Sequence, residues 1–142
     1  MIYTDSTKKA LKLCFEAHKE QVDKSGMPYV FHPFYLASQM TDEVSVTVAL
    51  LHDVVEDTKI SFDDLVTLGF SDEVIAALKL LTHEENVPYM EYVEKIKTNE
   101  TAKKVKLADL RHNSDLSRLD EISPKAVERQ KKYLAAIKFL EE

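Results

Sequence analysis

The fold of this chain is decided by the stretch VTVALLHDVVED, residues 46–57. Its first half is apolar and predicts a buried helix. Its second half places four side chains that bind metals or transfer protons within six positions, at His52, Asp53, Glu56 and Asp57. Burying that many charges costs a large free energy unless a cation or another partner offsets it. The stretch therefore predicts a metal site on a helix, with carboxylates beside it that can handle a water molecule.

The composition favours an all-α protein. The chain has 142 residues, which suits one domain with its own core, and we expect residues 1–142 to form a single domain. Apolar residues make up 44% and charged residues 31%, an ordinary globular balance. Because only 2 glycines and 4 prolines occur, good helix formers dominate and long strand-and-turn architectures are disfavoured.

The charge and the cysteine content restrict the partners and the compartment. A net charge of -6 disfavours nucleic acid, which needs a basic surface, and argues weakly against a membrane-surface role. Cys14 is the single cysteine, so a disulfide within the chain is excluded and a reducing compartment fits. The first residues do not resemble a secretory signal, and no apolar run approaches the roughly 20 residues that span a bilayer. We therefore expect a soluble, cytoplasmic protein.

Capping residues and apolar periodicity predict a bundle of roughly seven or eight helices, and no segment alternates as a half-buried strand does. Asp5 or Ser6 can cap the first helix, and Ser123 followed by Pro124 begins the last one. Residues 24–28 form a loop, since Gly26 and Pro28 disfavour helix there. The expected helices cover residues 5–22, 33–40, 42–56, 61–68, 71–82 and 101–119, with two more that begin at 88 and 124.

Four side chains are candidate metal ligands: His32, His52, Asp53 and Asp109. Two imidazoles with two carboxylates form a mixed nitrogen and oxygen set, which suits Mn²⁺, Fe²⁺ or Zn²⁺ with positions left for water and substrate. Asp109 lies in an otherwise apolar helical stretch, which indicates burial. Adjacent residues on a regular helix point about 100° apart, so His52 and Asp53 can share a metal only at a helix end or cleft. We therefore expect a pocket at the end of a helical bundle.

Other charged and aromatic residues have both a functional and an ordinary interpretation. Glu56 and Asp57 lie one turn after the His-Asp pair, where they either orient and deprotonate a water or form a solvated helix end. Lys106 and Asn113 each lie one turn from Asp109 and either line the same pocket or lie on the surface. By itself, His32 is an ordinary loop or capping histidine. The remaining histidines, His18, His83 and His112, are interpreted as structural or surface residues. The aromatic side chains Phe31, Phe34 and Tyr35 are interpreted as core.

The combined motifs resemble the hydrolase domain of the RelA/SpoT homologues, which are HD-superfamily proteins that degrade the alarmone (p)ppGpp. The resemblance covers about residues 9–119 and is close to the stand-alone small alarmone hydrolases, the group that includes the metazoan SpoT homologue. An HDxxED run combined with an upstream His-Pro and a downstream Lys-x-x-Asp is specific, whereas a bare His-Asp pair is not. The matching segments are YVFHP at 29–33, ALLHDVVEDT at 49–58 and VKLAD at 105–109, followed by His112 and Asn113.

The resemblance implies a role for each matching position. His32, His52, Asp53 and Asp109 match metal ligands that usually hold Mn²⁺, and Glu56 and Asp57 match the pair that activates the attacking water. Lys24, Lys106 and Asn113 match residues that contact the nucleotide. The implied substrate is a small nucleotide, and the implied reaction is hydrolysis of the 3′-pyrophosphate of ppGpp or pppGpp to GDP or GTP and pyrophosphate.

Two departures from the family pattern concern the base rather than the metal. Asp23 replaces an arginine that often stacks on the purine, and an acid cannot supply that stacking. Glu20 replaces the glycine of a Gly-Gln pair. The alternatives are therefore two. The chain is an HD hydrolase of another nucleotide, either NADPH, from which it removes the 2′-phosphate, or a nucleoside monophosphate, or it is a non-catalytic module that binds an alarmone.

Overall fold

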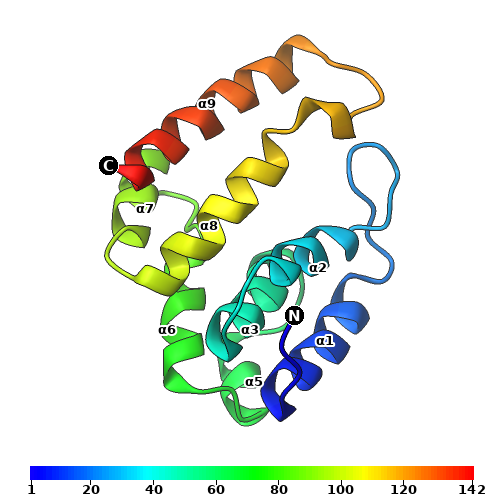
Figure 1. Ribbon diagram of the computed structural model, residues 1–142, viewed down its shortest axis with the longest axis vertical. Coiled ribbons are helices and arrows are strands. Elements are labelled where there is room, and N and C mark those ends of the chain that lie inside the picture. The colour runs from blue at the N-terminus through cyan, green and yellow to red at the C-terminus, as the bar shows by residue number, and fades with distance from the viewer.

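The computed structural model describes residues 1–142 and contains helices but no strand, which confirms the predicted all-α class (Figure 1). The only β pairing is an isolated bridge between Val22 and Pro28. In chain order the elements are α1 (Asp5–His18), α2 (Phe31–Ser38), α3 (Glu43–Leu51), α4 (Val54–Asp57), α5 (Phe62–Thr67), α6 (Asp72–Leu81), α7 (Tyr89–Ile96), α8 (Glu100–Asn113), the 3₁₀ helix η1 (Leu116–Arg118) and α9 (Pro124–Glu141).

Helix α3 forms the centre of the helical packing. Every residue of α3 from Ser45 to Leu51 is buried, and the helix packs against α1, α2, α6 and α8. In Figure 1, α9 runs beside α8 on the side away from α2 and α3. These elements enclose a cluster of 27 buried apolar residues. The apolar run 46–51 is thus the buried helix that the sequence predicts. None of the helices has both the length and the apolar character needed to span a bilayer.

The predicted 42–56 helix is interrupted between Leu51 and Val54, so α3 and α4 are separate elements. At the interruption the Nδ1–H of the His52 imidazole donates to the carbonyl oxygen of Ala49 at 2.7 Å. In a continuous helix that carbonyl would accept the backbone N–H four residues later, from Asp53. Asp53 instead adopts φ -109° and ψ 2° and begins α4. The pair His52 and Asp53 therefore lies at the junction between α3 and α4.

The first predicted helix is too long at its C-terminal end and begins at a different cap. Thr4, rather than Asp5 or Ser6, caps α1 by accepting the N–H of Thr7 at 3.3 Å. The helix ends at His18 instead of Val22. Beyond it the side chain of Asp23 accepts two backbone N–H groups of its own loop, which favours a turn over further helix.

The predicted 101–119 helix also ends early, at Asn113. The carboxylate of Asp115 accepts the backbone N–H of Ser117 at 3.0 Å and begins η1. Asparagine, aspartate and serine offer the backbone this local alternative to helical hydrogen bonds. The chain therefore turns between α8 and α9, and η1 forms part of the wall described below.

The prediction that Phe31, Phe34 and Tyr35 belong to the core is wrong. These side chains are 55%, 46% and 49% exposed, respectively. Helix α2 instead buries the face that carries His32, Pro33, Leu36 and Ala37. Residues three and four apart share a helix face, so burying His32 and Leu36 turns the aromatic residues toward solvent.

Candidate active site

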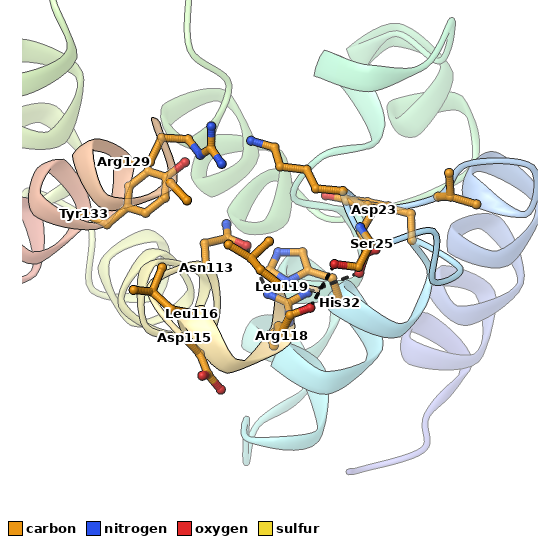
Figure 2. A pocket seen from close by; sticks show the side chains of 14 residues that line it. Asp23, Ser25, His32, Asn113, Asp115, Leu116, Arg118, Leu119, Arg129 and Tyr133 are labelled. Atoms are coloured by element: carbon orange, nitrogen blue, oxygen red, sulfur yellow. Dashed lines mark hydrogen bonds and ion pairs between the residues drawn. The ribbon is translucent and has the colours of Figure 1, made fainter. Parts of the chain in front are cut away.

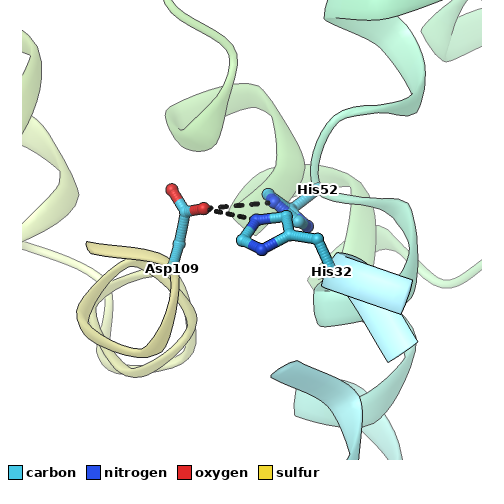
Figure 3. Close-up of side chains that lie close together, drawn as sticks. All are labelled: His32, His52 and Asp109. Atoms are coloured by element: carbon cyan, nitrogen blue, oxygen red, sulfur yellow. Dashed lines mark hydrogen bonds and ion pairs between the residues drawn. The ribbon is translucent and has the colours of Figure 1, made fainter. Parts of the chain in front are cut away.

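Three predicted metal ligands from three helices meet in the interior, namely His32, His52 and Asp109 (Figure 3). One donor atom from each lies within 4.8 Å of the other two, and all three residues are buried. His32 Nε2 lies 2.8 Å from Asp109 Oδ1, and His52 Nε2 lies 3.6 Å from the same oxygen. His32 comes from the first turn of α2, His52 from the end of α3 and Asp109 from α8.

The bonding of His52 fits a cation in this group. A carbonyl oxygen only accepts, so Nδ1 of His52 carries the proton that it shares with Ala49, and in the neutral ring Nε2 presents a lone pair. This buried Nε2 makes no hydrogen bond, although it lies 3.0 Å from Asp53 Oδ2. Burial opposes protonation, but the carboxylates of Asp53 and Asp109 outweigh it and raise the pKa of His52 well above its ordinary value. In the neutral ring the lone pair of His52 Nε2 and the carboxylates of Asp53 and Asp109 repel one another. A divalent metal placed among these atoms removes this repulsion, so the residues fit a divalent-metal site.

Asp53 lies beside the group of three and is held by Tyr29. The Tyr29 hydroxyl donates to Asp53 Oδ2, and this side chain was not among the predicted site residues. Burial acts to raise the pKa of Asp53, but His52 outweighs it and lowers that pKa to about 2. Asp53 is therefore ionised at neutral pH and supplies a second carboxylate next to His52.

Lys106 and Asn113 both bind the carboxylate of Asp109. Lys106 Nζ lies 3.0 Å from Oδ2, and Asn113 Nδ2 donates to Oδ1 at 3.0 Å. Burial acts to raise the pKa of Asp109, but the Lys106 charge and the histidine hydrogen bonds hold it well below its ordinary value. The Lys106 ammonium also lies over the ring of Tyr92, 5.3 Å from its centroid. Lys106 thus keeps Asp109 ionised in the interior.

His112, interpreted from sequence as structural or surface, contacts the candidate ligand His32 directly. The two Nδ1 atoms are 2.7 Å apart, and the rings are nearly parallel at 4°. Burial first, and then the positive charge of Arg118, lower the pKa of His112 to about 4. When Nε2 of His32 serves as a ligand, its Nδ1–H donates to the neutral His112, which fixes the tautomer of His32.

The predicted catalytic carboxylates, Glu56 and Asp57, lie on α4 next to this group. Glu56 Oε1 accepts the backbone N–H of His83 at 2.8 Å, which holds the end of α4 to the segment after α6. Gln21 Nε2 donates to the backbone carbonyl of Asp57 at 3.2 Å. Partial burial and the neighbouring Asp53 carboxylate raise the pKa of Asp57 to about 6. Both catalytic roles remain predictions.

A cavity of about 400 Å³ adjoins the metal group through His32 and Asn113 (Figure 2). Lys24 and Asn113 line this cavity and Lys106 does not, and the nucleotide contacts expected of all three remain predictions. Helix α9 and η1 contribute residues that the sequence did not single out, because only the fold brings them opposite the loop 22–28. The lining residues are Val22, Asp23, Lys24, Ser25, Tyr29, His32, Asn113, Asp115, Leu116, Arg118, Leu119, Ala126, Arg129 and Tyr133.

The cavity is lined by three cationic side chains and two carboxylates, Asp23 and Asp115, so its lining has an excess of positive charge although the chain is acidic. Lys24, Arg118 and Arg129 all line it. Burial first, and then the nearby charge of Arg129, lower the pKa of Lys24. In Figure 2, Arg129 and Tyr133 project from α9 toward the cavity. Arg129 and Tyr133 are four residues apart and so share a face of α9. The sequence shows this spacing, but without the fold it indicates only a solvent-exposed helix face.

Comparisons with known proteins agree with this geometry, although no protein-family model matches the chain. It is 37% identical to mouse guanosine-3′,5′-bis(diphosphate) 3′-pyrophosphohydrolase MESH1 over 120 residues, 73% of this chain and 66% of that protein. Xenopus tropicalis MESH1 is 33% identical over 77% of this chain and 68% of its own length. A probable enzyme of the same name from Synechocystis is 32% identical over 85% of this chain, but over only 18% of its own length. The chain thus spans about two thirds of the metazoan relatives.

A solved structure shows the same fold. It is described as a metazoan ortholog of SpoT that hydrolyses ppGpp, and it superposes with a TM-score of 0.77 at 28% identity. The superposition covers 99% of this chain and 85% of that one. The sequence identity, the HD-type all-α bundle and the buried histidine and aspartate group together show that the chain belongs to the RelA/SpoT-related family of guanosine-3′,5′-bis(diphosphate) 3′-pyrophosphohydrolases.

Proposed function

We propose that residues 1–142 act as one HD-type domain, a metal-dependent hydrolase that removes the 3′-pyrophosphate of ppGpp or pppGpp and leaves GDP or GTP. The observation that carries the proposal is the buried histidine and aspartate group, which opens into a cavity lined by three cationic side chains. The relatives at 33% and 37% identity bear the name of this activity. The buried, unpaired Cys14 suits the reducing cytoplasm in which we expect the enzyme to act.

His32, His52, Asp53 and Asp109 are proposed to hold the metal, with Mn²⁺ as the first candidate and Fe²⁺ or Zn²⁺ as the next. Nitrogen and carboxylate donors suit all three ions. A divalent cation bound here supplies a Lewis acid for the phosphoryl group and lowers the pKa of an attacking water. The protein contributes the orientation of the ligands, through Tyr29 on Asp53 and His112 on His32.

Glu56 and Asp57 are proposed to orient the attacking water and accept its proton. A general base works best when its pKa lies near the operating pH. The pKa of Asp57, raised to about 6, leaves the carboxylate ionised at neutral pH while making it a better proton acceptor than an ordinary aspartate. The contact between Glu56 and the His83 backbone fixes the position of α4.

Lys24 and Arg129 are proposed to bind the phosphates. Neither forms an ion pair in the structure, and the nearby charge of Arg129 acts, after burial, to lower the pKa of Lys24. An anionic group between two unpaired cations removes their repulsion, and phosphate fits this need. Asn113 lines the same cavity and binds Asp109, so it connects the substrate with the metal group.

The proposal is tested by measuring pyrophosphate release from ppGpp with Mn²⁺. Asp53→Asn and Asp109→Asn keep the shape of the side chains but remove their charge, and each is expected to lower activity by about 100-fold or more, since even partners of metal ligands contribute 10–100-fold. Asp63→Asn on the exposed face of α5 makes the same chemical change away from the site and is expected to retain full activity. Unchanged turnover in the two site variants would sink the assignment.

A second candidate is hydrolysis of a different nucleotide, such as NADPH at its 2′-phosphate or a nucleoside monophosphate. The observation that favours it is Asp23, an acidic residue in the cavity wall. A panel of these nucleotides assayed with Mn²⁺, Fe²⁺ and Zn²⁺ distinguishes the substrates, and a clear preference for ppGpp removes this candidate. Tight nucleotide binding without turnover by the fully metal-loaded protein would instead indicate a non-catalytic alarmone-binding module.

A further inference from the structure

The cavity has a second region that is chemically different from its phosphate-binding side. Leu116 and Leu119 line it from η1 and its flank, and Arg118 lies between them in the sequence. Arg118 and Arg129 are clearly separated in Figure 2, on different parts of the wall. An apolar surface with one arginine is a poor phosphate site but a good surface for a flat, partly apolar ring.

The guanidinium of Arg118 is held by a hydrogen bond through Nη1 and by an ion pair on the side of Nη2. Nη1 donates to the backbone carbonyl of His112 at 2.9 Å and lies 3.4 Å from Asn113 Oδ1. Nη2 lies 3.8 Å from Asp23 Oδ2, and this pair is partly buried, with side chains 26% and 24% exposed. Because Nη1 is bonded to the protein and Nη2 faces the Asp23 carboxylate, the guanidinium is held against the wall, which favours its flat face as the surface offered to a ligand.

Two segments that are far apart in sequence hold Arg118 in this position. Asp23 is itself fixed by the N–H groups of Ser25 and Met27 at 2.9 and 3.0 Å. The Ser25 hydroxyl donates to the backbone carbonyl of Arg118 at 3.1 Å and accepts the N–H of Asp120 at 3.2 Å. The loop and η1 therefore form one continuous wall, in which the Asp23 carboxylate orients the arginine.

We propose that Arg118, oriented by Asp23, is the residue that stacks on the nucleobase of the substrate and so determines its base specificity. This inference rests on the proposed function. The phosphates then lie toward Lys24 and Arg129, and the base lies over Arg118 with Leu116 and Leu119 beside it. Asp23, whose carboxylate cannot itself stack on a base, acts as a positioning residue for the arginine.

The test is calorimetric binding of GDP and of inorganic pyrophosphate to the Mn²⁺-loaded full chain, neither of which requires turnover. Arg118→Lys keeps the positive charge but loses the plane. We expect it to weaken GDP binding by roughly 5- to 150-fold, the range for loss of one stacking contact, and to leave pyrophosphate binding within about twofold. Asp23→Asn keeps the oxygen that caps the loop but removes the charge that holds Arg118, and it is expected to weaken GDP binding by a smaller factor. Arg111→Lys, on the exposed side of α8, is the matched control and is expected to bind both probes normally.

The outcomes separate this inference from the hydrolase assignment. If Arg118→Lys binds GDP as wild type does, Arg118 does not contact the base and the proposal is overturned. If it loses GDP and pyrophosphate affinity equally, Arg118 contacts phosphate and the proposal is overturned as well. Absence of GDP binding to wild type overturns it as well. Selective loss of GDP affinity supports the inference even if the protein does not hydrolyse ppGpp. If the protein hydrolyses ppGpp but Arg118→Lys keeps its GDP affinity, the inference is overturned and the hydrolase assignment stands. Should Arg118→Lys fail to fold, the same pair of probes applied to Asp23→Asn decides, and unchanged GDP affinity in that variant overturns the proposal.

Discussion

Individual side chains around the metal group act mainly by holding its ligands in one state. Tyr29 donates to Asp53, His112 pairs with His32, and Lys106 neutralises Asp109. Ligand partners of this kind set the tautomer, the charge and the orientation of the donor atoms. Substitutions at these positions should therefore change metal affinity or stability in ways that identify each role.

Replacing His112 tests the histidine pair. His112→Phe keeps a flat ring but removes the acceptor for His32 Nδ1–H, and we expect it to weaken Mn²⁺ binding by about 10–100-fold. His112→Asn restores an acceptor and should recover part of the affinity. Calorimetric titration of the metal-free protein measures both. Equal affinities in wild type and His112→Phe would show that His112 does not orient the ligand.

Lys106→Met removes one partner of a buried ion pair. The side chains of Lys106 and Asp109 are 14% and 9% exposed, so the variant leaves the buried Asp109 carboxylate without its lysine partner. We expect the metal-free variant to lose about 3–5 kcal/mol of unfolding free energy in urea. Lys104→Met, on the same helix but in a pair with both side chains 52% exposed, should change it by at most about 1 kcal/mol. Equal losses in the two variants would contradict the role of Lys106.

At the scale of elements, the junction between α3 and α4 connects the fold with the chemistry. Four residues form α4, too few for stability by themselves, so tertiary contacts such as that of Glu56 with the His83 backbone hold it. The same side chain is a proposed catalytic group. Two substitutions of Glu56 can therefore separate its role in positioning α4 from its proposed role in catalysis.

Glu56→Gln keeps an oxygen that can accept the His83 N–H but cannot take a proton. We expect it to retain wild-type stability and lose about 10²–10⁴-fold in turnover of ppGpp. Glu56→Ala should lose the same activity and also about 1 kcal/mol of stability, the usual net value of a hydrogen bond. Thermal unfolding and pyrophosphate release measure the two effects. An active Glu56→Gln enzyme would show that Glu56 only positions α4.

Sequence patterns predicted the elements better than their ends. Residues 46–51 are apolar except for Thr47, so a buried central helix followed directly from them. The ends at His18, Leu51 and Asn113 depend on side chains that bind nearby backbone groups, a competition that periodicity does not reveal. Likewise, His32 and Asp109 stood out by residue type, whereas Arg129 and Tyr133 became visible only once α9 was placed beside the cavity.

For the whole molecule, protons and metal compete for the same buried group. In the metal-free protein the pKa of His52 is raised above its ordinary 6.5, so His52 stabilises the fold fully below pH 6.5 and this stabilisation is lost as the pH rises through the raised pKa. The pKa of Asp53 is lowered from 3.8 to about 2, so its contribution is present above pH 3.8 and is lost as the pH falls toward 2.

We therefore expect the metal-free protein to be most stable on the acidic side of neutrality and to lose stability above pH 6.5. Mn²⁺ takes the place of the His52 proton, so the metal-loaded protein should not show the loss at high pH. Urea unfolding from pH 4 to pH 9, with Mn²⁺ or with a chelator, measures the difference. Parallel stability curves under the two conditions would show that the cation does not bind at His52.

The distance along the chain between the metal ligands has a consequence for the life of the protein in a cell. His32 and Asp109 are 77 positions apart, and their side chains meet only after α2, α3 and α8 have packed. A nascent or partly folded copy therefore lacks the cluster and competes poorly for scarce ions. With the metal bound as proposed, metal acquisition would be a late step of maturation, so metal starvation and impaired folding would have the same outcome in a cell, a smaller amount of metal-loaded protein.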